Sequence, residues 1–157
     1  MTDAYGWLKL VHVLSGAVLF GTGLGTAFHM WLAHRSGDVR PIAAAARSTV
    51  LADWLFTAPA VLLQPATGLL LAGLAGIDLT SRWLLAVYAL YAVAGACWLP
   101  VVWLQLRVRA LAVAAVAAGG PLPPAYHRCM RAWFWLGWPA FAAVLAIYAL
   151  MVARPEL

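Results

Sequence analysis

The sequence predicts an all-α fold, a polytopic membrane protein built as a four-helix transmembrane bundle. Of its 157 residues, 66% are hydrophobic and 10% are charged, whereas a soluble domain is about half apolar and about a quarter charged. A soluble fold of this size leaves about a third of its surface in water, so it has no place for this much apolar surface. The apolar residues also fall into four long runs. We therefore expect residues 1–157 to form a single transmembrane domain.

Each run reaches the roughly 20 residues that a helix needs to cross a bilayer. Tryptophans lie near the ends of the runs, where their amphipathic rings favour the membrane interface. The predicted spans are Tyr5–Ala33, Leu51–Gly76, Trp83–Leu106 and Arg131–Val152.

The basic residues predict the orientation, because positive charge accumulates on the cytoplasmic side. The loops between spans one and two and between spans three and four are rich in arginine, while the other side of the membrane has few basic residues. We therefore expect both termini outside the cytoplasm, in a bacterial inner membrane. The basic excess is explained by topology and lipid headgroups, so no nucleic-acid partner is predicted. The short link at residues 77–82 predicts that spans two and three form a tight hairpin.

A histidine lies about five residues inside the first span. Gly16 and Gly23 share a face with His12, since steps of 4 and 11 residues return to within about 40° on a helix. A histidine above small residues leaves a flat slot that suits a macrocycle whose iron takes an axial imidazole. The alternative is plain packing: Gly21 and Gly25 form a GxxxG pair, and small residues let membrane helices approach closely.

A polar stripe marks the second span. Asp53, Thr57, Gln64 and Thr67 fall within about 40° of one line, and such groups face the bundle or a wet cavity. The threonines favour hydrogen bonds between helices. For Asp53 and Gln64, a pocket and a packing role both stay open. A buried carboxylate favours an arginine partner, and Arg131 is a candidate for a salt bridge or for an anion site at the mouth of span four.

Two prolines interrupt the same span. Pro59 and Pro65 lack the backbone N–H that would bond the carbonyls of Leu55 and Val61. The prolines should bend the helix and leave two acceptors for neighbouring groups.

Several stretches carry a family resemblance that covers nearly the whole chain. The opening WLKLVHVLSGAVLFGTGLGTAFHMWLAHRSGD, the stretches LADWLFTAPAVLLQPATGLLLA and ACWLPVVWLQLRVR, and the ending GWPAFAAVLAIYALMVARP resemble a bacterial integral-membrane family, the domain of unknown function numbered 2269. The resemblance implies a four-span inner-membrane protein and implies no reaction.

A more distant similarity is limited to the first span. Its K-x-x-H, at Lys9 and His12, resembles the corresponding segment of four-helix haem-binding membrane protoporphyrinogen oxidases and of copper-resistance D-type domains. In the oxidase family a first-span histidine ligates haem, which implies His12 as the ligand here. That family also uses a lysine in its third span, and this sequence has none there.

Three functions follow as hypotheses. The first is a redox protein that holds haem b at His12 and acts with a quinone or a porphyrin-like substrate. The second is a non-enzymatic subunit or assembly factor of a larger complex, and the third is a permease built as a homo-oligomer with Asp53 and Gln64 along its path. Motifs for nucleotide binding, zinc peptidases and serine hydrolases are absent from the sequence. The positions of Cys97 and Cys129 predict no disulfide.

Overall fold

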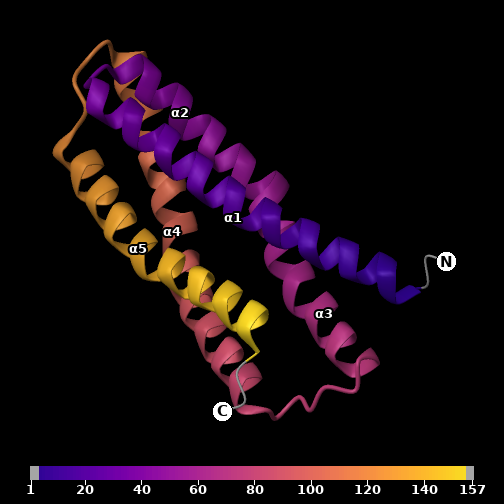
Figure 1. Cartoon of the computed structure of the whole chain (residues 1–157). Coiled ribbons are helices and arrows are strands. Elements are labelled where there is room, and N and C mark those ends of the chain that lie inside the picture. The colour runs from indigo at the N-terminus through magenta and orange to yellow at the C-terminus, as the bar shows by residue number, and fades with distance from the viewer. Residues whose placement is uncertain (1–3, 155–157) are drawn as a thin grey trace.

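The computed structural model describes residues 4–154 and is helical throughout, with no strand in that range. The first helix is long and is followed by a bent helix in three parts and then by two more long helices (Figure 1). Their bounds are α1 Ala4–Ser36, α2 Val39–Ala52, η1 Asp53–Thr57, α3 Ala58–Leu74, α4 Arg82–Ala118 and α5 Pro124–Ala153. Four helical stretches are long and apolar enough to cross a membrane, with α2, η1 and α3 forming one of them. The fold class is thus the predicted one.

The helices extend beyond the predicted spans at the arginine-rich end. Most of the expected first loop is the helix α2, and α4 continues twelve residues past Leu106. Helix α1 stops at Ser36 because Gly37 adopts a left-handed φ of 69° and Asp38 caps α2 by accepting from the Arg40 amide. Helix α4 ends in the same way at Gly119, with φ of 61°. The arginines predicted to lie in loops therefore lie within helices.

The helices associate in two groups. Helices α4 and α5 pack along much of their lengths, while α1 packs against α2 and α3, and α2 also packs against α4. In Figure 1 the α1–α2–α3 group and the α4–α5 pair lie close together at the upper left and diverge toward the ends of α1 and α3. The molecule is therefore closed most tightly at the end where α2 lies.

Two apolar clusters hold the groups together. The larger joins α1, α2, α4 and α5 at the arginine-rich end, and Ile42, Ala112 and Tyr126 are fully buried in it. The smaller joins α3, α4 and α5 at the other end, through Ala72, Leu84 and Val87. Between the clusters the two groups are joined mainly by a few side chains. This arrangement leaves room for a cleft at intermediate depth.

Helices α3 and α4 do not form the tight hairpin that the short link predicted. The two helices share the Ala72 cluster, but α4 packs mainly against α5 and α2. The link at residues 75–81 contains Gly76 in a left-handed conformation, and Asp78 accepts hydrogen bonds from the Thr80 amide and hydroxyl. The bonds from Thr80 hold the pKa of this exposed carboxyl below its usual value.

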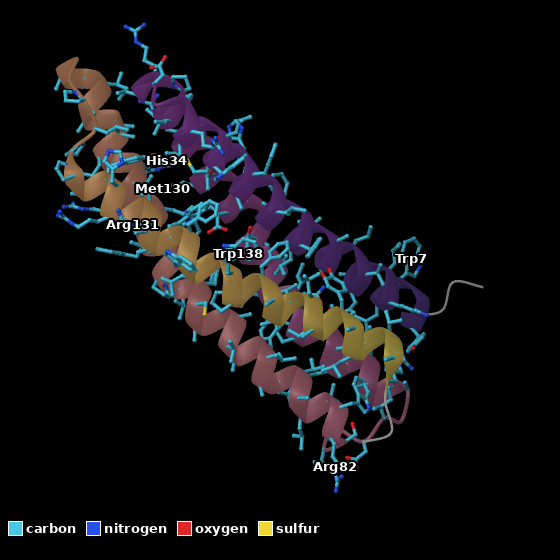
Figure 2. The ribbon with its side chains drawn as sticks, turned by 60° about the vertical axis from the view of Figure 1, so that its left-hand side comes forward. Trp7, His34, Arg82, Met130, Arg131 and Trp138 are labelled. Atoms are coloured by element: carbon cyan, nitrogen blue, oxygen red, sulfur yellow. The ribbon has the colours of Figure 1, made fainter. Side chains whose placement is uncertain are left out.

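The first and last described residues lie at the same end of the molecule. Trp7 and Arg82 are near that end, whereas His34, Met130 and Arg131 are near the opposite one (Figure 2). The start of α1 and the end of α5 thus lie on the same side of the bundle as the α3–α4 link, as the predicted topology requires. Which side faces the cytoplasm stays a prediction, and residues 1–3 and 155–157 of the predicted domain lie outside the described range.

A π-helical turn separates α2 from α3. The Ala58 amide bonds to the Asp53 carbonyl, five residues back, at the point where Pro59 removes an α-helical donor. The π turn holds one residue more than an α turn, so every later residue is rotated by about 100° from its expected position. The polar residues before and after this turn therefore face different neighbours.

Candidate functional site

The polar residues of α3 form a hydrogen-bonded network with α1. The Gln64 amide Nε2 donates to the His12 carbonyl oxygen at 2.6 Å and to Ser15 Oγ at 2.7 Å. The Nδ1 atom of His12 lies 2.8 Å from Thr67 Oγ1, and Thr67 in turn donates to the Leu63 carbonyl at 2.6 Å. Gln64 and Thr67 thus bind two membrane helices together, as expected for polar groups inside a bilayer.

The slot expected beside His12 is filled in this structure. A Cβ atom at Gly16 would lie 3.0 Å from the Tyr148 hydroxyl and 3.2 Å from the Gln64 amide nitrogen. The His12 ring packs on Gly68, with Cε1 3.2 Å from where a Cβ would be. Gly23 is open but lines a different space, the cleft described next. A macrocycle on this face would have to displace Gln64 and Tyr148, so the described residues do not offer haem a pocket at His12.

A partly open cleft of about 520 Å³ lies between the two helix groups. Nine of its 24 lining residues are aromatic, and the rest are mostly aliphatic or glycine. Four tryptophans line it, namely Trp31, Trp98, Trp133 and Trp138, and Trp138 lies near the middle of α5 (Figure 2). The cleft is therefore an apolar, ring-lined space at intermediate depth in the bundle.

Asp53 supplies the cleft's charge. No lysine, arginine or histidine among the described residues lines the cleft, and Asp53 is the one carboxylate there. Its side chain is 8% exposed, and Oδ1 accepts a long bond of 3.5 Å from Trp98 Nε1. Within residues 4–154 no basic group lies within ion-pair distance of it, and Arg131 is exposed on α5. The expected arginine partner is thus replaced by an indole N–H.

Further polar groups line the cleft. Thr57 lines it beside Asp53, although a hydrogen bond between helices was expected of this residue. Gln105 is 8% exposed, and its amide has no hydrogen-bond partner within the described part of the chain. The Trp133 indole N–H is buried and likewise has none there.

Sequence reasoning did not select Gln105 or Trp133 as candidate site residues. A glutamine within a long apolar run is a signal that could have found Gln105, because membrane spans rarely contain unpaired amides. Nothing in the sequence distinguishes Trp133 from the tryptophans of the interface. Its role depends on which face of α5 turns inward.

The Val61 carbonyl confirms one local prediction. Pro65 leaves this oxygen without a helical donor, and the Tyr91 hydroxyl of α4 donates to it. The bond crosses the space between the two helix groups, and both residues line the cleft. Both cysteines are free, as predicted.

Comparison with known proteins gives one match. A family model described as "Predicted integral membrane protein (DUF2269)" matches residues 6–155. No curated protein and no solved structure matches the chain. The family resemblance is thereby confirmed, while the distant similarity to the oxidases and the copper-resistance domains stays a prediction.

Proposed function

We propose that this chain, which belongs to the DUF2269 family of predicted integral membrane proteins, binds a small, mostly apolar, ring-containing molecule in the cleft. The observation that carries the proposal is the cleft itself, about 520 Å³ in volume, lined by aromatic rings and holding a buried carboxylate. Ligand sites in proteins are typically concave spaces of about 300–1,000 Å³ with apolar walls and a few polar groups. The cleft has this composition.

Its polar groups suit ligand recognition better than packing. The Trp133 N–H is buried without a partner among the described residues, which leaves its desolvation uncompensated. The amide of Gln105, a residue 8% exposed, also has no hydrogen-bond partner in that range. A ligand carbonyl or hydroxyl could accept from both of them. A quinone head therefore fits the donors, and this supports the quinone part of the redox hypothesis.

A permease role also draws on the cleft. Asp53 lines it, as a path for a small molecule requires, but Gln64 is held in the network with α1. A subunit or homo-oligomer role rests on Gly21 and Gly25, where no atom lies within 4 Å of a would-be Cβ. These two roles stay predictions.

Filling the cleft tests the proposal. Gly23 and Gly95 line it, and no atom lies within 4 Å of a Cβ at either position. Leucine there should occupy the space without a clash, so Gly23→Leu and Gly95→Leu should each lower probe affinity about tenfold or more while the fold is kept. The probes are decylubiquinone, which is neutral, and tetraphenylphosphonium, which is cationic. Binding is measured on the purified full chain in detergent, as the saturable part of tryptophan quenching or equilibrium dialysis.

Gly73→Leu is the matched control. Gly73 on α3 is also exposed and free of neighbours within 4 Å, but it does not line the cleft. It should leave binding unchanged. If neither probe binds saturably, or if Gly73→Leu weakens binding as much as the cleft variants do, the cleft is not a ligand site.

Haem at His12 is the second candidate. Because the Thr67 hydroxyl donates to the Leu63 carbonyl, it can accept from His12 Nδ1–H, which leaves the Nε2 lone pair for a metal. A haem ligand is usually oriented by such a bond. The face of α1 at Gly16 is filled by Gln64 and Tyr148, which argues against haem binding at His12. A reduced-minus-oxidised spectrum of the protein from haem-replete cells, compared with that of His12→Ala, decides the question.

A further inference from the structure

The charge in the cleft is one-sided. Asp53 is buried there, and in the described part of the chain the lining holds no basic side chain. The arginines of the same end, including Arg107, Arg128 and Arg131, are exposed on helix surfaces, and none is within ion-pair distance of Asp53. A carboxylate in a low-dielectric setting without a cation is strongly unfavourable. The described residues thus leave a place for a positive charge beside Asp53 and supply none there.

The neutral donors beside Asp53, the Thr57 hydroxyl and the Trp98 indole, bring no positive charge to it. The Trp98 N–H lies 3.5 Å from Oδ1, at the long limit for such a bond. A well-satisfied buried carboxylate accepts several bonds, usually short and charge-assisted. Because Asp53 lines the cleft, a ligand bound there can provide the positively charged partner that the described residues do not.

The cleft walls favour the same sign of charge. Tyr91 and the four tryptophans Trp31, Trp98, Trp133 and Trp138 all line the space. Aromatic rings attract cations through the negative charge on their faces, and the attraction increases when water is excluded. The carboxylate and the rings therefore select a cation with apolar groups over a neutral or anionic molecule of the same shape.

We propose that the ligand of the cleft is a lipophilic organic cation, held by Asp53 as its counter-charge and by the surrounding aromatic rings. This inference rests on the proposed ligand-binding function and specifies the ligand's charge. Such a molecule partitions into the bilayer through its apolar groups. It could enter from there, because the cleft is partly open between the two helix groups.

Two probes of one shape and opposite charge test the sign. Tetraphenylphosphonium and tetraphenylborate are measured by equilibrium dialysis against the purified full chain. The phosphonium should bind at least about tenfold more tightly than the borate, because close opposite charges in a desolvated site differ by that much or more from like charges. Asp53→Asn should remove most of the preference, and Asp53→Glu should keep part of it because it keeps the charge.

Asp78→Asn is the control for total charge. It makes the same chemical change at a carboxylate that is exposed in the α3–α4 link, outside the cleft. Phosphonium affinity should be unchanged in this variant. A matching thermal transition for wild type and the Asp53 variants shows that the fold is kept.

The outcomes separate the two proposals. If decylubiquinone binds in a way that Gly95→Leu abolishes, while phosphonium and borate bind equally or Asp53→Asn has no effect, the cleft is a ligand site and the cation inference is wrong. If Asp53→Asn unfolds the protein, the Asp53→Glu variant tests the cation inference. This variant must still bind phosphonium more tightly than borate, or the inference is wrong. If none of the three probes binds saturably, both proposals fail.

Discussion

The role of Gln64, either in a pocket or in helix packing, is decided by its neighbours. In the sequence it belonged to a stripe that suited either a pocket or helix packing. In the structure its amide bonds the His12 carbonyl and Ser15 Oγ on α1, so its role is packing. Gln105 has the same side chain, the same kind of apolar surroundings and no such partner. The difference between the two lies in their neighbours.

The two glutamines give a matched prediction. Gln64→Leu should lower the free energy of unfolding by about 1 kcal/mol, since hydrogen bonds between membrane helices each contribute from about 0.6 up to about 1.7 kcal/mol. Gln105→Leu removes an amide without a partner and should leave stability unchanged or higher. Unfolding in mixed micelles with increasing SDS measures both. Equal destabilisation of the two variants would show that the network with α1 contributes nothing specific.

At the scale of the element, the bent helix α2–η1–α3 directs its polar residues to two sites. Asp53 and Thr57 line the cleft, whereas Gln64 and Thr67 bond α1. A regular helical period places all four on one line. The π turn at Asp53–Thr57 adds a residue to that turn and so rotates the later pair away from the earlier one. The prolines indicated a bend, but the π turn itself carries no clear sequence signal.

Pro65 and Tyr91 give a prediction at the same scale. Tyr91→Phe removes the donor to the Val61 carbonyl, which Pro65 leaves free. It should destabilise the protein by about 1 kcal/mol. In a Pro65→Ala background the alanine N–H can bond that carbonyl, so Tyr91→Phe should then have little effect.

Unfolding of the wild type, both single variants and the double variant completes the cycle. The double variant should be destabilised by about 1 kcal/mol less than the sum of the two single effects. Strict additivity would mean that the Tyr91 hydroxyl does not compensate for the proline.

At the scale of the whole molecule, the two helix groups are joined near their ends and are hollow between. The large cluster around Ile42 and Tyr126 closes the arginine-rich end, and the Ala72 cluster closes the other. Between them small and aromatic residues leave the cleft. The cleft exists because α4 packs mainly on α5 and α2 and much less on α3.

Sidedness is a prediction for the whole molecule. In a background with Cys97 and Cys129 replaced by alanine, Thr80→Cys in the α3–α4 link should react with an impermeant maleimide on intact cells. Ser36→Cys at the α1–α2 turn should react only after the membrane is opened. Both positions are exposed, so accessibility reports the side. The reverse pattern would place the arginine-rich end outside.

The fold class, the four spans and the free carbonyl of Val61 could all be predicted from the sequence. Hydrophobic run length and the chemistry of proline are local properties that no neighbour alters. Tertiary structure decided which of the polar residues became a site. The role of a helical face depends on which element packs against it. Because of the π turn, Asp53 faces the aromatic cleft while Gln64 faces α1. The cleft itself is made of residues from four separated stretches of chain, so only the packing of the two helix groups brings it into being.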